Sequence, residues 1–225
     1  MNTREAWTAV GGLSKPSKMP GGAYGIPAAE CKTGKQLQKV EGSTCYGCYA
    51  MKGCYAFKIV QDAQYRRLAS IRTAVWVDAM ITLINSKKSK FFRWHDSGDV
   101  QDLEHLKKIY EVCKGTPTIQ HWMPTREAWV KRYLDQKPAN LLIRFSMPMI
   151  DQEAAASWPN TSTVTSDHSV NNCPAFRTDK TGTVHTLEAF NAMTKFKKKE
   201  LDLGHCGSCR RCWNPEVKNV AYGQH

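Results

Sequence analysis

The segment Phe91-Phe92-Arg93-Trp94-His95-Asp96-Ser97-Gly98-Asp99 decides the fold class of this chain. It begins with apolar, strand-like residues and ends in a polar turn. A helical segment follows, whose apolar face carries Leu103, Leu106, Tyr110 and Cys113. The same order recurs downstream as Thr118 to Trp122 with Glu127 to Leu134, as Asn140 to Ser146 with Gln152 to Ser157, and as a last strand at Thr161 to Thr165. Alternating strands and helices of this kind are typical of parallel βα units.

We therefore predict an α/β fold whose parallel βα units form a partial barrel or an open sheet, two arrangements that periodicity does not distinguish. A chain of 225 residues with 41% hydrophobic residues is expected to form a single domain. Within it we expect a loop-rich segment at 1–57, a βα core at 58–170 and a cysteine-rich C-terminal cap at 171–225. The longest predicted helix runs from about Phe57 to Asn85, and a single helix is expected in the cap, from Leu187 to Leu201.

Polar side chains gather where the predicted strands end, and in parallel sheets this edge is where ligands bind. The four strand ends read Arg93 to Asp99, Gln120 to Arg126, Arg144 to Met147 and Thr165 to His168. His95 and His121 are candidates for acid–base chemistry, with a structural hydrogen-bonding role as the alternative. Arg93 and Arg144 are expected to face the interior, where each needs an acid or a bound anion. Asp99 is the candidate acid for Arg93, with a bound anion as the alternative.

Nine cysteines fall mainly into two groups, and Cys113, on a predicted apolar helix face, is expected to be a core residue. We call Cys31, Cys45 and Cys48 the first cysteine group, with Cys54 just downstream. We call Cys173, Cys206, Cys209 and Cys212 the second cysteine group. The N-terminus lacks the features of a secretory signal and no run of eighteen apolar residues occurs, so a cytoplasmic protein without a membrane span is expected. In a reducing compartment, such grouping favours metal or redox chemistry over disulfides.

The spacing of the second group is that of an iron–sulfur site. The run C-x2-C-x2-C with a distant Cys-Pro matches the bacterial ferredoxin pattern, so a [4Fe-4S] cluster is expected, and tetrahedral zinc is the alternative. In the first group, three thiols would leave one iron open, whereas Cys54 would close the site. The helix expected after Cys48 would favour anionic thiolates through its N-terminal amides. The chain thus carries one or two clusters, and a single cluster shared by both groups remains open.

The charge of the chain permits a polyanionic partner. Thirty-two basic residues against twenty acidic ones give a formal net charge of +12. The lysines form small clusters at 87–90 and 195–199 and no single stripe, so nucleic acid is a possible partner and a solvated surface is the alternative.

Taken together, several motifs resemble the phage "gene product 88" protein family. They are Ile26-Pro27-Ala28, Cys31, Cys45-x2-Cys48-Tyr49-Ala50, Arg93-x-His95-x-Ser97-Gly98-Asp99, Thr125-Arg126, Cys173-Pro174 and Cys206-Gly207-x-Cys209-x2-Cys212-Trp213. The resemblance runs from about residue 20 to 213. It implies a phage setting, hence the host cytoplasm, and iron–sulfur ligation.

A more distant resemblance is to radical S-adenosylmethionine enzymes, which hold a three-cysteine cluster in the loop before the first helix of a partial barrel. It implies that Ser97, Gly98, Asp99, Thr125 and Arg126 bind S-adenosylmethionine. The C-x3-C-x2-C spacing of those enzymes is not present, since Cys31 stands fourteen residues before Cys45. The sequence thus predicts an iron–sulfur phage protein, either an enzyme of this type or a relict of one. The alternatives are a zinc-stapled nucleic-acid-binding module and an electron-transfer protein that takes electrons from a donor.

Overall fold

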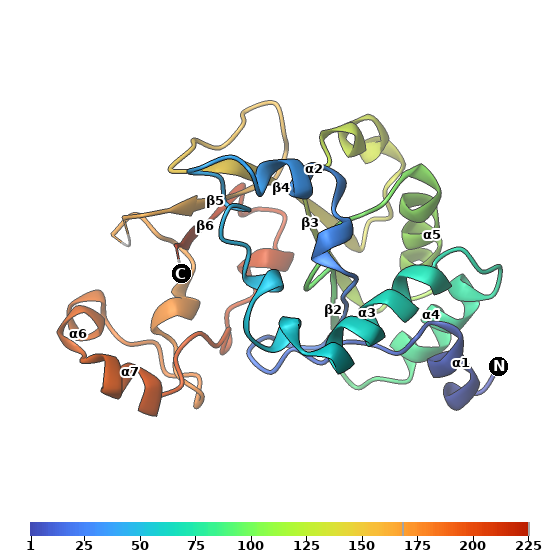
Figure 1. Cartoon of the computed structure of the whole chain (residues 1–225), viewed down its shortest axis with the longest axis horizontal. Coiled ribbons are helices and arrows are strands. Elements are labelled where there is room, and N and C mark those ends of the chain that lie inside the picture. The colour runs from blue at the N-terminus through green and yellow to red at the C-terminus, as the bar shows by residue number, and fades with distance from the viewer. Residues whose placement is uncertain (168, 225) are drawn as a thin grey trace.

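Six parallel strands form one open sheet in the order β1-β2-β3-β4-β5-β6 (Figure 1). The computed structural model describes residues 1–167 and 169–224. The strands are β1 Gly22–Tyr24, β2 Phe91–Trp94, β3 Gln120–Thr125, β4 Leu141–Ile150, β5 Thr161–Thr165 and β6 Asn219–Gly223. Every neighbouring pair is parallel. The prediction of parallel βα units is confirmed, in the form of an open sheet.

The helices lie mainly toward the two ends of the long axis. They are α1 Thr3–Ala9, α2 Lys32–Leu37, α3 Lys58–Ser70, α4 Trp76–Asn85, α5 Leu103–Lys114, α6 Leu187–Ala192 and α7 Lys195–Glu200. Short 3-10 helices are η1 Ala28–Glu30, η2 Tyr49–Met51, η3 Gly53–Ala56, η4 Ala128–Gln136, η5 Pro174–Arg177 and η6 Arg211–Trp213. In Figure 1, α1, α4 and α5 lie at one end of the molecule and α6 and α7 at the other.

Successive side chains of β2 point to opposite faces of the sheet. Phe92 and Trp94 belong to the main hydrophobic core, which they share with α1, α4 and α5. Phe91 points to the opposite face, where its ring lies 5.3 Å from the ring of Trp213. The C-terminal segment therefore covers the face of the sheet that the main core leaves uncovered.

Two strands were not expected from the sequence. β1 comes from the Gly- and Pro-rich N-terminal segment and has three residues, and β6 has five residues near the C-terminus. Such short segments give little hydrophobic periodicity, and their pairing with β2 and β5 supplies what the local sequence does not. The sheet thus extends beyond residues 58–170 on both sides.

The prediction of one helix from Phe57 to Asn85 is wrong, because the chain turns between α3 and α4. The linking residues Ile71, Thr73 and Val75 are β-branched and lose side-chain freedom in a helix. The hydroxyl of Thr73 donates to the carbonyl of Ser70 at 2.8 Å, a local bond that competes with helix continuation. The turn lets α4 begin with Trp76, which is fully buried.

Three other predicted helices also differ from the structure. Residues 152–157 form a loop and turn, and Glu127 to Leu134 is replaced by the 3-10 helix η4. Leu187 to Leu201 is split, because the Thr194 hydroxyl accepts from the amide of Lys197 and caps a new helix, α7.

His168, expected at the end of a strand, lies outside the described residues. Across the described ranges, no helix is long and apolar enough to span a bilayer.

Candidate functional site

The thiols of Cys31 and Cys45 converge on the first turn of α2. Cys31 directly precedes this helix, and Cys45 is buried in the loop that follows it. Gly34, inside α2, makes room for both. A Cβ atom added there would lie 3.5 Å from the Cys31 sulfur and 3.7 Å from the Cys45 sulfur. A larger side chain at position 34 would therefore occupy the space that the two sulfurs share.

Cys48 completes this neighbourhood. Burial raises the pKa of the Cys31 thiol, and negative charge on Asp99, Cys48 and Cys45 raises it further. Burial also raises the pKa of Cys48, which the backbone amides of Ala50 and Met51 partly offset by hydrogen bonding to its sulfur. The helix predicted directly after Cys48 is the single 3-10 turn η2, and its amides provide these bonds. The first cysteine group and Asp99 thus share one electrostatic environment.

Asp99 lies at the carboxyl edge of the sheet and receives hydrogen bonds from two strand ends. Its Oδ1 accepts from the amide of Val100 at 2.7 Å and its Oδ2 from the amide of Arg126 at 2.8 Å. Burial raises the pKa of Asp99 to about 6, although the bonds from Arg126 and from the Thr125 side chain oppose this rise. The carboxyl group is therefore mostly ionised at neutral pH.

Arg126 bridges Asp99 and β4. Its Nη1 donates to the carbonyl oxygens of Ser146 at 3.1 Å and Met147 at 2.8 Å. Its positive charge lies near Cys48 and offsets part of the rise that burial causes in the pKa of that thiol. The structure thus brings Asp99, Thr125 and Arg126 together beside the first cysteine group.

Ser97 and Gly98 have a different part in this edge, since they hold the loop after β2 against the exit of β1. The Ser97 hydroxyl donates to the Ile26 carbonyl at 2.8 Å and accepts from Gln64 at 2.8 Å. Gly98 has a φ of 79°, and a Cβ there would lie 2.3 Å from the Cγ1 atom of Ile26, so only glycine fits. These two residues position Asp99.

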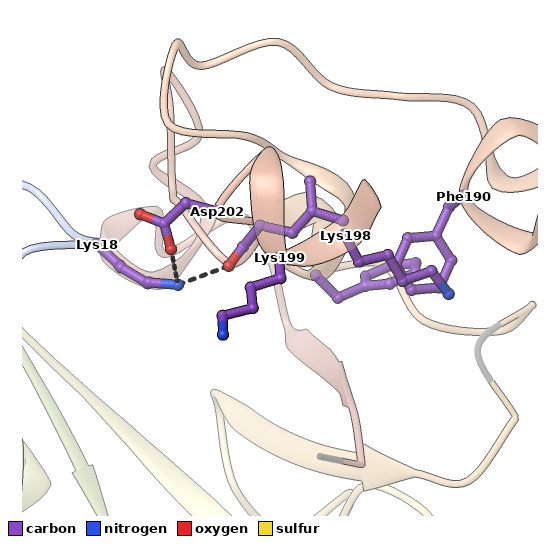
Figure 2. A pocket seen from close by; sticks show the side chains of 7 residues that line it. Lys18, Phe190, Lys198, Lys199 and Asp202 are labelled. Carbon is purple, nitrogen blue, oxygen red and sulfur yellow. Dashed lines mark hydrogen bonds and ion pairs between the residues drawn. The ribbon is translucent and has the colours of Figure 1, made fainter. Parts of the chain in front are cut away.

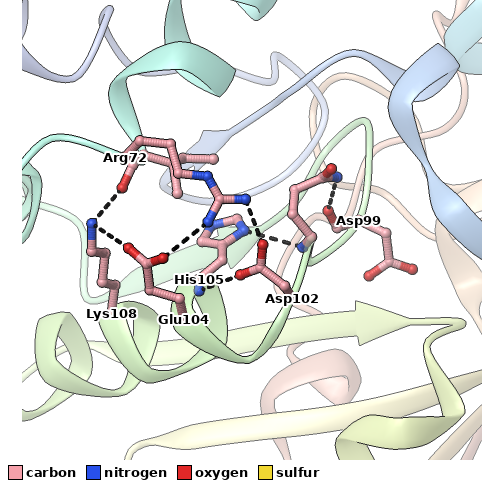
Figure 3. Close-up of polar contacts among 8 residues, drawn as sticks. Arg72, Asp99, Asp102, Glu104, His105 and Lys108 are labelled. Carbon is pink, nitrogen blue, oxygen red and sulfur yellow. Dashed lines mark hydrogen bonds and ion pairs between the residues drawn. The ribbon is translucent and has the colours of Figure 1, made fainter.

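The far side of the same loop is tied to the helices. The Gln101 side chain donates to the Asp99 carbonyl at 2.9 Å, and Asp102 caps α5 and pairs with Arg72 (Figure 3). Figure 3 also shows the Asp99 carboxylate pointing away from this network. The loop is therefore fixed on one side and presents its carboxylate on the other.

The second cysteine group lies on the face of the sheet opposite the main hydrophobic core. Burial raises the pKa of Cys173 to about 12, and charge on the other three thiols of the group raises it too. The amide of Ala175, at the start of η5, bonds to the Cys173 sulfur. Burial and the charges on Cys212 and Cys209 likewise raise the pKa of Cys206, to about 11. The four thiols therefore form a second electrostatic cluster.

A family model described as Gene product 88 matches residues 2–215, nearly the whole chain. The chain belongs to this family of phage gene products. Neither a curated protein nor a solved structure matches the chain significantly. The family assignment therefore brings no assigned reaction with it.

Sequence reasoning missed how this Gene product 88 chain holds its second cysteine group. Arg144, fully buried on β4, was expected to need an acid or an anion. Its guanidinium instead donates to the carbonyl oxygens of Val217, Arg211, Asn214 and Cys212 at 2.7 to 3.1 Å. These carbonyls lie some seventy residues away along the chain, so no local sequence pattern predicts the contact.

Arg93 links the two cysteine groups. Trp213, which follows the last cysteine of the second group, packs 5.2 Å from the ring of Trp122. The Arg93 guanidinium carbon lies 4.8 Å from the same Trp122 ring, and its Nη2 donates to the hydroxyl of Tyr49 at 3.4 Å. Tyr49 follows the last cysteine of the first group. A continuous run of side chains therefore joins the two groups.

Arg93 is also a cation shared by this region. Burial lowers its pKa, but the nearby Tyr49, Asp96 and Tyr222 outweigh burial and leave the pKa raised. Asp99, which we expected as its partner, is bonded to amides instead. The charge of Arg93 acts on the thiols of Cys206 and Cys212. Its Nε atom is buried and has no partner among the described residues.

The two candidate acid–base histidines are buried. His121 contacts Trp94 Nε1 at 3.1 Å and the Thr116 hydroxyl at 2.8 Å, and burial lowers its pKa to about 3. His95 contacts the carbonyl of Tyr24 at 2.5 Å, and burial lowers its pKa to about 4. Both ring nitrogens of His121 are engaged, as the alternative of structural hydrogen bonding predicts. Nε2 of His95 is buried without a partner among the described residues.

The two cysteines outside the first and second groups lie in different surroundings. Cys113 is fully buried, as expected of a core residue, whereas Cys54 is exposed on η3. In residues 1–167 and 169–224, no three His, Cys, Asp or Glu side chains lie close enough together to hold a single metal ion.

Proposed function

We propose that this chain is an iron–sulfur protein with a [4Fe-4S] cluster on the first cysteine group and a ligand site beside it at the carboxyl edge of the sheet. The observation that carries the proposal is the meeting of Cys31, Cys45 and Cys48 with Asp99 in one electrostatic environment. Three thiolates would leave one iron of a cubane without a protein ligand, so that iron would have a coordination position open to another molecule.

The spacing of the thiols is compatible with a cluster. A cubane carries its irons on separate corners, so its thiolates stand further apart than the ligands of one ion, which all lie about 2.3 Å from the metal in a zinc site. The room left by Gly34 between two of the sulfurs supports the same interpretation.

The ligand we propose is of the S-adenosylmethionine class, with an ammonium and a carboxylate on one carbon. Asp99, ionised at neutral pH, attracts the ammonium group. Arg126 has five N–H donors, and its two bonds to β4 both come from Nη1, which leaves others for a carboxylate. A bound cluster would supply one-electron reduction and a coordination position. The residues of the chain bind and orient the ligand.

The second cysteine group would hold a closed, auxiliary [4Fe-4S] cluster with four thiolates. The contacts through Trp213, Trp122 and Arg93 lead from it toward the first group. In this arrangement a separate protein or small molecule donates electrons to the chain.

The test is electron spin resonance of the anaerobically reconstituted, dithionite-reduced protein, titrated with S-adenosylmethionine. We expect the spectrum to change on binding and Asp99→Asn to weaken binding at least about tenfold, because a charge-assisted hydrogen bond is lost. Asp62→Asn, on exposed α3, removes the same charge and leaves binding unchanged.

Three outcomes separate the alternatives. Clusters that titrate reversibly but ignore S-adenosylmethionine, with no cleavage of it under reduction, mean an electron-transfer protein. Zinc without sulfide contradicts the iron–sulfur proposal and favours a zinc-stapled binding module. Equal affinities for the wild type and Asp99→Asn exclude the proposed ligand contact.

A further inference from the structure

The short helix α7 presents a basic side with an aromatic residue in it. Its sequence is Lys-Phe-Lys-Lys-Lys-Glu. At about 100° per residue, Lys195, Lys198, Lys199 and Phe196 fall on one side of the helix. Lys197 falls on the other side, where it pairs with Glu200 at 3.2 Å. We call Lys195, Phe196, Lys198 and Lys199 the α7 basic patch.

Phe196 is the most exposed of the large hydrophobic side chains in the described ranges, with 78% of its surface accessible. An aromatic ring so exposed gains free energy from any partner that covers it. In the same ranges, none of the three lysines of the patch forms an ion pair with a carboxylate. The patch thus offers uncompensated positive charge around an uncovered ring.

The patch continues into a hollow of about 400 Å³ between α7 and the segment that carries Lys18 (Figure 2). Lys198 and Lys199 line it, and the Lys198 ammonium lies 3.7 Å from the centroid of the Phe190 ring. Lys18 closes one side, where it bonds to Asp202 at 2.8 Å and to the Leu203 carbonyl at 2.7 Å. The hollow is also lined by Asp202, Phe176, Phe190 and Leu203. A polyanion passing over the patch therefore meets a partly apolar recess in which Lys198 and Lys199 supply the positive charge.

The patch is held in place at its base. The segment with α6 and α7 lies between Cys173 and Cys206, and its ends meet where the amides of Gly204 and His205 donate to the carbonyl of Thr178 at 3.0 and 3.2 Å. In Figure 1 this segment stands at one end of the molecule, away from α1, α4 and α5. It is thus a projecting element anchored beside the second cysteine group.

We propose that the α7 basic patch and the adjoining hollow bind single-stranded nucleic acid. The lysines contact phosphates, and Phe196 stacks on a base. The net charge of +12 attracts a polyanion. Aromatic rings set in a positively charged surface are the means by which proteins hold unpaired bases, whose faces a duplex conceals. An acidic protein would satisfy the lysines but would not need the exposed ring.

The experiment measures affinity by fluorescence anisotropy over a range of salt concentrations, with a single-stranded thymidylate of about 20 nucleotides, its RNA counterpart, the matching duplex and polyglutamate. The test variant changes Lys195, Lys198 and Lys199 to Ala. The matched control changes Lys87, Lys88 and Lys90 to Ala, which removes the same charge from another exposed segment.

We expect the test variant to weaken single-strand binding at least about tenfold and to reduce the salt slope by about 2, since each phosphate contact contributes about 0.7. The control variant changes both far less. Phe196→Ala weakens binding about tenfold at an unchanged slope, and Phe196→Trp restores it. Because the patch holds no cysteine, the iron content of these variants stays that of the wild type, so this test is independent of the cluster proposal.

The proposal is overturned if both lysine variants lose the same affinity, because binding then follows total charge. It is also overturned if Phe196→Ala has no effect, or if the duplex or polyglutamate binds as tightly as the single strand. Circular dichroism of each variant shows whether the fold is retained.

Discussion

At the scale of single residues, Gly34 shows how a position with no side chain shapes the candidate site. Gly34→Leu places a side chain between the sulfurs of Cys31 and Cys45, while leucine is a good helix former and preserves α2. We expect the variant to keep its fold and to lose about half the iron of the reconstituted protein. The control is Gly47→Leu, in the loop that carries Cys45 and Cys48, where an added Cβ would lie 3.7 Å from the Lys52 ammonium. Equal iron in the two variants would contradict the assigned site.

Arg93 permits a second prediction at this scale, through its charge. Its guanidinium acts on Cys206 and Cys212, so it stabilises added negative charge on a cluster there. We expect Arg93→Met to lower the reduction potential of the second cluster by on the order of 50 mV. Arg93→Lys keeps the charge and shifts the potential less. Potentials that agree in all three proteins would show that Arg93 is not near that cluster.

At the scale of elements, the turn before β6 depends on one side chain of β4. Arg144→Met leaves several buried carbonyl oxygens without donors, which costs at least about 3 kcal/mol of stability. We expect urea unfolding to reveal this loss and metal analysis to show iron missing from the second group alone. Arg211→Met, at an exposed side chain of the same turn, is the control. Iron retained in full by Arg144→Met would mean that other contacts hold the turn.

The elements also show what the sequence was able to predict. The sequence predicted strands at 91–95, 118–122, 140–146 and 161–165, which correspond to β2, β3, β4 and β5. In the structure β3 continues to Thr125 and β4 to Ile150. β1 and β6 were not predicted, since their identity depends on pairing with a neighbouring strand more than on their own residues. The contacts of Arg144 could not be predicted either, because they join β4 to backbone some seventy residues distant.

Candidate site residues divide along the same line. Asp99 and Arg126 follow the consecutive strands β2 and β3, and Thr125 ends β3. Sequence order and parallel topology were therefore sufficient to predict that the three lie at one edge of the sheet. Sequence periodicity does not encode packing. It therefore could not predict the turn between α3 and α4, the space that Gly34 leaves for two sulfurs, or the exposure of Phe196. The metal ligands remain a prediction from spacing.

At the scale of the whole molecule, buried histidines make stability depend on pH. Burial lowers the pKa values of His95 and His121 to about 4 and about 3, whereas in the unfolded chain both titrate near 6.5. The unfolded state therefore binds more protons below pH 6.5, and stability falls as pH falls from there toward 4. Each histidine contributes about 1.4 kcal/mol per pH unit in this window.

The check is urea unfolding at a series of pH values between 7 and 5. His121→Asn should reduce the slope of stability against pH by the contribution of one histidine, whatever its effect on stability at neutral pH. His205→Asn, at a partly exposed site beside Asp202, serves as the control. A slope that His121→Asn leaves unaltered would mean that His121 is protonated in the folded protein.

The central claim is that the two cysteine groups hold separate iron–sulfur clusters. Its most direct test is the iron, acid-labile sulfide and zinc content of anaerobically reconstituted protein, compared with Cys48→Ser and Cys209→Ser variants. We predict about eight iron and eight sulfide per chain, falling to about four of each in either variant. Zinc in place of sulfide, or a chain that takes up no iron, would contradict the account.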